Sequence, residues 1–234
     1  MRSPRHSRRL HPVQRRGNPA SGSRISAQRV YYDPCPQVTD PAGIEPWREP
    51  GATAARINVL DQMNQGQALV TYNGHANPWQ MAVTDIKFAR PYLFNLIDVP
   101  DLDNAEKLFI QMSMTCYTSQ FTRPGEFSHT TLDEALLLHP DGGAVGVWGP
   151  AGLSVAHGHD SLQTGFHKAL RNKTPLTARL GELVSAGYFE LVTNGSCCLD
   201  VAHTFLFSGD PLTVAGIQPL EKIYLPLVRR GGQN

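Results

Sequence analysis

Two apolar segments of the sequence end on residues that together could perform thiol chemistry. The stretch LVTYNGHANPW (69–79) carries an apolar run that stops at Gly74 and His75, and KLFIQMSMTC (107–116) runs directly into Cys116. A thiol is a weak nucleophile until it becomes a thiolate, and a neighbouring imidazole can accept its proton or stabilise the anion. The two residue types therefore predict nucleophilic catalysis, provided that the fold brings the two segment ends together.

The surrounding segments predict a sheet that would do this. Apolar runs typical of strands occupy 29–32, 68–72, 107–116, 144–149 and 203–216. Patterns with helical periodicity occupy 53–65, 130–139, 159–170 and 174–192. This order predicts an α/β layered fold with a mostly parallel sheet flanked by helices. Because ligands of parallel sheets bind beyond the carboxyl ends of the strands, His75 and Cys116 are expected at one edge. The segment 77–104 is rich in Pro and Asp and is expected to be a long irregular surface loop.

Length and charge predict one globular domain between two tails. The chain has 234 residues with 41% hydrophobic content, which is enough for one substantial core. Residues 1–29 hold eight of the 21 Lys and Arg residues and none of the 20 acidic ones, so the remainder carries 13 basic against 20 acidic residues. The arm 1–28 lacks the apolar core of a signal peptide and is expected to be disordered, and 217–234 is expected to be a C-terminal tail. Nucleic-acid binding is not expected, because no aromatic residues are interleaved with the basic ones, and no apolar run is long enough for a membrane span.

Each candidate residue also has a structural interpretation. A cysteine that ends a buried strand can be a small core residue, and a histidine after glycine can be a turn residue. The segment HGHD (157–160) could supply ligands for a zinc-dependent hydrolase, or it could be a polar loop in which Asp160 or Ser161 caps the next helix. Trp79 and Trp148 could line a substrate pocket or pack in the core.

Several segments in register resemble the gingipain family of cysteine peptidases, which are relatives of the caspases. The segments GQALVTYNGHA, FIQMSMTCYTSQF, TTLDEALLLHPDGGAVGVWGPAGLS and FLFSGDPLTV occur in the order that the family shows. The resemblance spans about 29–215 and implies a three-layer caspase-like fold for a peptidase domain over 29–216.

The resemblance implies a role for each matching residue. Cys116 would be the nucleophile and His75 the base or ion-pair partner, with an acyl-enzyme thioester intermediate and protein or peptide substrates. The backbone N–H groups of Ala76 and Cys116 would form the oxyanion hole, and Asp33 would orient His75 or line the specificity pocket. No cofactor or metal is implied. The setting would be extracellular or at the cell surface, although this chain shows no signal peptide.

The sequence departs from the family pattern in two places. Ala76 stands where the family has glycine, and alanine keeps the N–H but disfavours positive φ. The family's catalytic domains also begin well upstream of the strand at 29–32, so the domain is expected to lack its upstream part. The alternative function is therefore a truncated or degenerate caspase-like scaffold that binds partners without cleaving them.

Overall fold

A computed structural model describes most of the chain between the two tails. The described residues are 27–32, 48–49, 51–84, 87, 89–122, 130–172, 177–194 and 198–216. The predictions about Asp33, the tail 217–234 and nearly all of the basic arm concern residues outside these ranges.

The main sheet has four strands in the order β3 (Leu69–Asn73), β7 (Phe109–Met114), β8 (Ala144–Pro150) and β9 (Phe205–Gly209). β3, β7 and β8 are parallel, and β9 runs antiparallel to β8. The prediction of a mostly parallel sheet is confirmed. All six residues of β7 are buried, which explains why its sequence reads as one apolar run with few polar interruptions.

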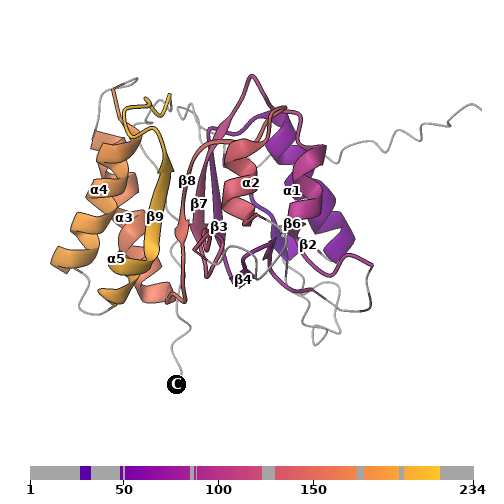
Figure 1. Cartoon of the computed structure of the whole chain (residues 1–234), viewed down its shortest axis with the longest axis horizontal. Coiled ribbons are helices and arrows are strands. Elements are labelled where there is room, and N and C mark those ends of the chain that lie inside the picture. The colour runs from indigo at the N-terminus through magenta and orange to yellow at the C-terminus, as the bar shows by residue number, and fades with distance from the viewer. Residues whose placement is uncertain are drawn as a thin grey trace, which may run out of the picture.

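Helices cover both faces of this sheet and complete the three predicted layers (Figure 1). On one face lie α1 (Ala52–Gln65) and α2 (Leu132–Leu138). On the other lie α3 (Ala156–Asn172) and α4 (Leu180–Asn194), which pack closely on each other, with the short α5 (Asp200–Thr204) leading into β9. Within the described residues, no helix combines the length and apolar character that crossing a membrane requires.

Each face of the sheet carries its own hydrophobic core, and β7 contributes to both. Ile110, Met112 and Met114 pack with the side chains of α3 and α4, whereas Phe109 packs with those of α1 and α2. Because successive side chains of a strand point to opposite faces, β7 divides its residues between the two cores. A residue's position along β7 therefore determines which helical layer it meets.

Two helix boundaries lie where sequence signals predict them, whereas α4 begins at Leu180 rather than near 174. α1 ends at Gly66, which has φ 89° and donates its N–H to the Met63 carbonyl. Thr131 begins α2 in a capping box with Glu134, each side chain accepting from the other residue's backbone N–H. By contrast, α3 begins at Ala156, so HGHD lies inside the helix, and the prediction that Asp160 or Ser161 caps it was wrong.

The predicted loop 77–104 contains ordered structure, and the prediction of an irregular segment was wrong. An antiparallel sheet of β4 (Ala76–Asn77), β5 (Gln80–Met81) and β6 (Phe94–Asn95) is followed by the 3-10 helix η2 (Leu96–Asp101). Strands of two residues are too short to show a sequence alternation. Buried side chains hold the segment on the α1/α2 core, among them Met81, Phe94, Val99 and Leu102.

The first two predicted strands lie outside the centre of the main sheet. β3 is parallel to β7 and forms an edge of the described sheet, with Thr71 and Asn73 exposed. The segment 29–32 yields only β1 (Tyr31–Tyr32), which pairs with β2 (Arg48–Glu49) in a separate two-stranded sheet.

Candidate active site

The register of β3 and β7 places His75 and Cys116 at the same edge of the sheet. The last registered pair is Asn73 with Met114, and each candidate residue follows two positions later on its own strand. The Gly74 N–H still donates to the Met114 carbonyl at 3.4 Å, which extends the ladder by one residue. His75 and Cys116 therefore follow the ends of two neighbouring parallel strands at one edge of the sheet.

The backbone at His75 explains why the strand stops at glycine and histidine. The Tyr72 hydroxyl donates to the His75 carbonyl at 2.7 Å, and the Ala82 N–H donates to the same oxygen at 2.8 Å. A Cβ atom on Gly74 would lie 2.5 Å from the Tyr72 hydroxyl, so this close approach requires glycine. The His75 side chain is left exposed to solvent.

Ala76 occupies an extended strand, so replacing glycine at this position causes no strain. The described non-glycine residues with positive φ are Ala82, Tyr117 and Cys198. Because the His75 carbonyl accepts from Ala82, the facing residues Ala76 and Met81 form a non-hydrogen-bonded pair of the β4–β5 ladder. The Ala76 N–H therefore points away from β5 and is not used by that ladder.

Cys116 lies half-buried in a tight turn that follows β7. Its thiol donates to the Ser154 carbonyl, with 3.6 Å between sulfur and oxygen. Tyr117 has φ 63° and donates its N–H to the Gly152 carbonyl at 3.1 Å, which attaches the turn to the segment after β8. Within the described part of the chain, the Cys116 N–H has no hydrogen-bond partner, and no hydrogen bond joins the Cys116 thiol to the His75 imidazole.

Ser154 is a neighbour of the thiol that sequence reasoning missed, and His159 holds it. The His159 Nε2 and Ser154 Oγ atoms are 2.7 Å apart, and the His159 ring packs edge-on against Phe205 with 5.3 Å between centroids. Burial lowers the pKa of His159, which favours the neutral imidazole. His157, in contrast, is exposed, and among the described residues no three His, Cys, Asp or Glu side chains are grouped so as to hold a metal ion.

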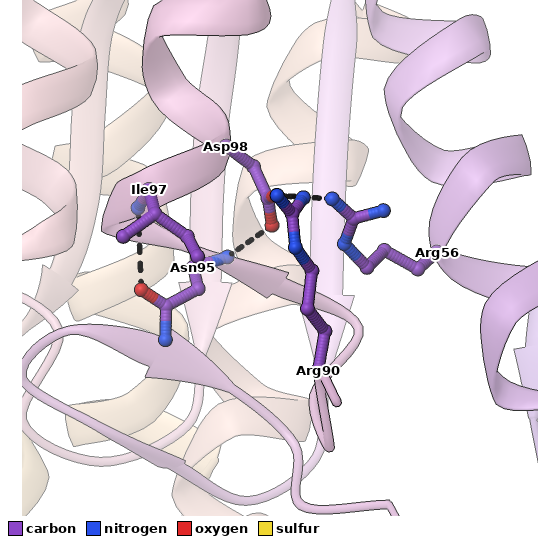
Figure 2. Close-up of polar contacts among 5 residues, drawn as sticks. All are labelled: Arg56, Arg90, Asn95, Ile97 and Asp98. Carbon is purple, nitrogen blue, oxygen red and sulfur yellow. Dashed lines mark hydrogen bonds and ion pairs between the residues drawn. The ribbon is translucent and has the colours of Figure 1, made fainter. Parts of the chain in front are cut away.

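The insert that begins after His75 is attached to α1 through a buried carboxylate (Figure 2). Asp98 in η2 accepts the Asn95 N–H at 3.0 Å, while the Asn95 side chain accepts the Ile97 N–H at 3.2 Å. The same carboxylate pairs with Arg56 of α1 at 2.7 Å and with Arg90 at 3.3 Å. These contacts connect the small β4–β5–β6 sheet, and through it the His75 backbone, to the helical layer.

The raised pKa of Asp98 makes the free energy of unfolding dependent on pH, because burial disfavours the ionised carboxylate even beside its arginine partners. Burial raises the pKa of Asp98 to about 6, against the opposing effects of the Asn95 N–H and Arg90. An acid whose pKa is higher in the folded than in the unfolded chain holds its proton more tightly in the fold, so its stabilising contribution is present below about pH 4. We expect that contribution, up to roughly 3 kcal/mol of unfolding free energy, to be lost as pH rises through about 6.

Urea unfolding between pH 4 and pH 7 measures this dependence. In a plot of unfolding free energy against pH, Asp98→Asn is expected to remove the decrease that Asp98 causes. The reason is that the amide does not titrate in this range. Asp103→Asn, which changes an exposed carboxyl nearby, is the matched control and should leave the curve unchanged. An Asp98→Asn variant with the wild-type slope would contradict the assignment.

Two further features of the fold do not include His75 or Cys116. Trp148 is fully buried in the α3/α4 core, so its indole is not exposed to solvent. A hollow of about 340 Å³ lies beside α2, β8 and β9, and Ser119, Val147 and Ser208 are among its lining residues. Neither His75 nor Cys116 lines this hollow, but Ser119, three residues after Cys116, and Asp133 do.

Comparison with solved structures defines the class of fold. A complex of the pro- and mature domains of Porphyromonas gingivalis RgpB matches with a TM-score of 0.59 at 20% identity, covering 71% of this chain and 38% of that chain. The Arg-specific cysteine proteinase gingipain R matches with a TM-score of 0.55 at 20% identity, covering 71% of this chain and 37% of that one. A structure described only as a protease matches with a TM-score of 0.56 at 15% identity, covering 72% and 39%. The fold is therefore the caspase-like α/β fold of cysteine proteinases.

Sequence comparison identifies the family within this class. The sequence model of peptidase family C25 matches residues 6–215, a span that begins inside the basic arm. The chain belongs to peptidase family C25, the gingipain family of cysteine peptidases. No curated protein matches the sequence significantly. The chain spans less than two fifths of the length of the solved structures that it resembles.

Proposed function

We propose that the chain is a cysteine endopeptidase in which Cys116 is the nucleophile and His75 the general base. The observation that carries this proposal is the parallel register of β3 and β7, whose last pair, Asn73 and Met114, precedes the two residues by the same two positions. Membership of a cysteine peptidase family supports the reaction class. Protein or peptide substrates and an extracellular or cell-surface setting follow from the same membership as parts of the proposal.

The reaction begins when His75 accepts the thiol proton and the Cys116 sulfur attacks the peptide carbonyl carbon. The tetrahedral intermediate expels the amine, which takes the proton from the His75 imidazolium, and a thioester remains on Cys116. Water, deprotonated by His75, then attacks the thioester and releases the new carboxyl terminus. No cofactor enters this scheme. In each step, the proton that one group loses is accepted by another group in the site.

In the first step the Cys116 thiol must leave the Ser154 carbonyl and form a hydrogen bond to the His75 imidazole instead. In the structure the Cys116 thiol donates to the Ser154 carbonyl, a weak hydrogen bond at 3.6 Å that rotation about the Cα–Cβ bond can break. Catalytic hydrogen bonds are often absent or long before substrate binds. The proposal requires that rotation toward the β3 side bring the sulfur within reach of the exposed imidazole of His75.

Two backbone N–H groups are suited to stabilise the tetrahedral oxyanion. The Cys116 N–H has no partner among the described residues, and the Ala76 N–H points away from the β4–β5 ladder. Donors that are fixed and unused before the reaction can bind developing negative charge without reorganisation. Asp33 remains the proposed orienting or specificity acid.

A non-catalytic scaffold is the second candidate function, and one observation favours it. The thiol is bonded to the Ser154 carbonyl rather than to an imidazole, as expected for a cysteine that is not activated. In this case the same fold would bind peptides or partner proteins without cleaving them.

Alkylation with iodoacetamide near neutral pH distinguishes the two functions. An activated Cys116 is expected to react roughly tenfold or more faster than an ordinary thiol, because the thiolate is the reacting species. His75→Ala should remove this advantage, whereas His157→Ala, which replaces another exposed histidine, should not. Peptide mapping locates the adduct, and Cys198, which is disulfide-bonded, should remain unlabelled without reductant. Slow labelling of Cys116 that His75→Ala does not change would overturn the proposed peptidase.

A further inference from the structure

A buried carboxylate lies directly behind the turn that carries Cys116. Asp133 is the second residue of α2, and its side chain is almost completely buried. One carboxylate oxygen accepts the Ser113 hydroxyl at 2.9 Å, and the other accepts the Ser119 hydroxyl at 2.6 Å. Ser113 lies three residues before Cys116 and Ser119 three residues after it, so one side chain connects both ends of the turn.

Backbone contacts strengthen the same connection. The Asp133 N–H donates to the Thr118 carbonyl at 3.2 Å, and the Ser119 N–H donates to the Pro150 carbonyl at 3.0 Å. Gln111 extends the side-chain network along β7 by donating to the Ser113 hydroxyl at 3.2 Å. The turn is therefore held by the first turn of α2 below it and by the end of β8 beside it.

The neighbouring strand leaves the space that the carboxylate occupies. A Cβ atom on Gly149 of β8 would lie 2.1 Å from the Asp133 Oδ2 atom and 2.9 Å from the Ser119 hydroxyl. Glycine is the residue that permits this approach, because any side chain at this position would displace the carboxylate. The network occupies the α2 face of β7, whereas the thiol continues the opposite face and contacts Ser154.

We propose that Asp133 is a positioning residue that fixes the Cys116 turn by binding Ser113 and Ser119 at its two ends. The inference rests on the proposed function, since a fixed turn matters to catalysis only where Cys116 is the nucleophile. Asp133 does not touch the thiol. It acts through the two serines, which determine where the turn leaves the sheet and hence the position of the sulfur relative to His75. A buried hydroxyl left without its hydrogen-bond partner costs free energy, so both attachments hold the turn.

Two serine variants test this role without removing the buried carboxyl group of Asp133. Ser113→Ala and Ser119→Ala each delete one attachment and avoid the risk that Asp133→Ala fails to fold. Each is expected to speed amide hydrogen exchange in the turn by about tenfold or more, at Thr115, Tyr117 and Gln120. Those three N–H groups bond within the turn or to Gly152. Each variant is also expected to slow the His75-dependent alkylation of Cys116 several-fold.

The control is Thr131→Ala, which weakens the cap of the same helix but leaves both attachments to Asp133 in place. It should lower the unfolding midpoint without changing exchange in the turn or the alkylation rate. Lost stability alone is therefore not expected to change exchange in the turn or the alkylation rate. Faster exchange in the serine variants together with no effect of His75→Ala in any variant would support the positioning of the turn and overturn the proposed peptidase. Wild-type exchange and alkylation in both serine variants would overturn the role of Asp133.

Discussion

Replacing Cys116 by alanine is expected to lower kcat/KM for a cleavable peptide by roughly 10³-fold or more. In the proposed mechanism the sulfur atom forms the thioester, and an alanine side chain has no atom that can take its place. Stability should change by no more than about 1 kcal/mol, because Cys116 is only half-buried and its thiol makes one weak hydrogen bond. Hydrolysis of a fluorogenic peptide mixture and urea unfolding measure the two effects separately.

A pair of exposed histidines provides the control for this measurement. His75→Ala is expected to lower kcat/KM by about 10²-fold or more, since general-base catalysis contributes on that scale. His157→Ala changes the same residue type at another exposed position and should leave kcat/KM unchanged. Cleavage by Cys116→Ala at the wild-type rate would show that another group attacks the substrate.

The sheet and the candidate residues His75 and Cys116 could be predicted because long buried strands are recognisable in the sequence as apolar runs. β7 and β8 are six and seven residues long and almost wholly buried, so their apolar runs identify them without ambiguity. Once both strands before His75 and Cys116 are taken as parallel neighbours, topology alone places the two residues at one edge. This inference requires only the positions at which the two strands end, and no knowledge of side-chain contacts.

The supporting residues could not be predicted in the same way. Asp133 binds Ser113, 20 positions away, and the Cys116 thiol meets the Ser154 carbonyl, 38 positions away. Contacts over such separations have no period or motif in the sequence. The insert after His75 was missed for a different reason, because its two-residue strands are stabilised by buried side chains rather than by an alternating pattern.

Trp148 shows how the core behind β8 supports the same edge of the sheet. The indole is fully buried and contacts the rings of Phe166, Tyr188 and Phe205, with centroids 6.0, 5.5 and 6.1 Å away. Its Nε1–H donates to the Tyr188 hydroxyl at 3.1 Å. A Cβ atom on Gly187 would lie 2.4 Å from the indole, so α4 approaches the ring as closely as glycine allows. One side chain thus packs against α3, α4 and β9 at once.

Trp148→Ala is expected to lower the unfolding free energy by about 3–5 kcal/mol, the range for removing a buried aromatic side chain and leaving a cavity. Trp148→Phe should cost less, because part of the aromatic packing remains while the hydrogen bond to Tyr188 is lost. Phe189→Ala removes an aromatic ring that is 70% exposed on α4 and should change stability by about 0.5 kcal/mol or less. Urea unfolding of the three variants measures these differences. If Trp148→Ala cost no more than Phe189→Ala, the indole could not be a core residue, and its interpretation as the wall of a substrate pocket would have to be restored.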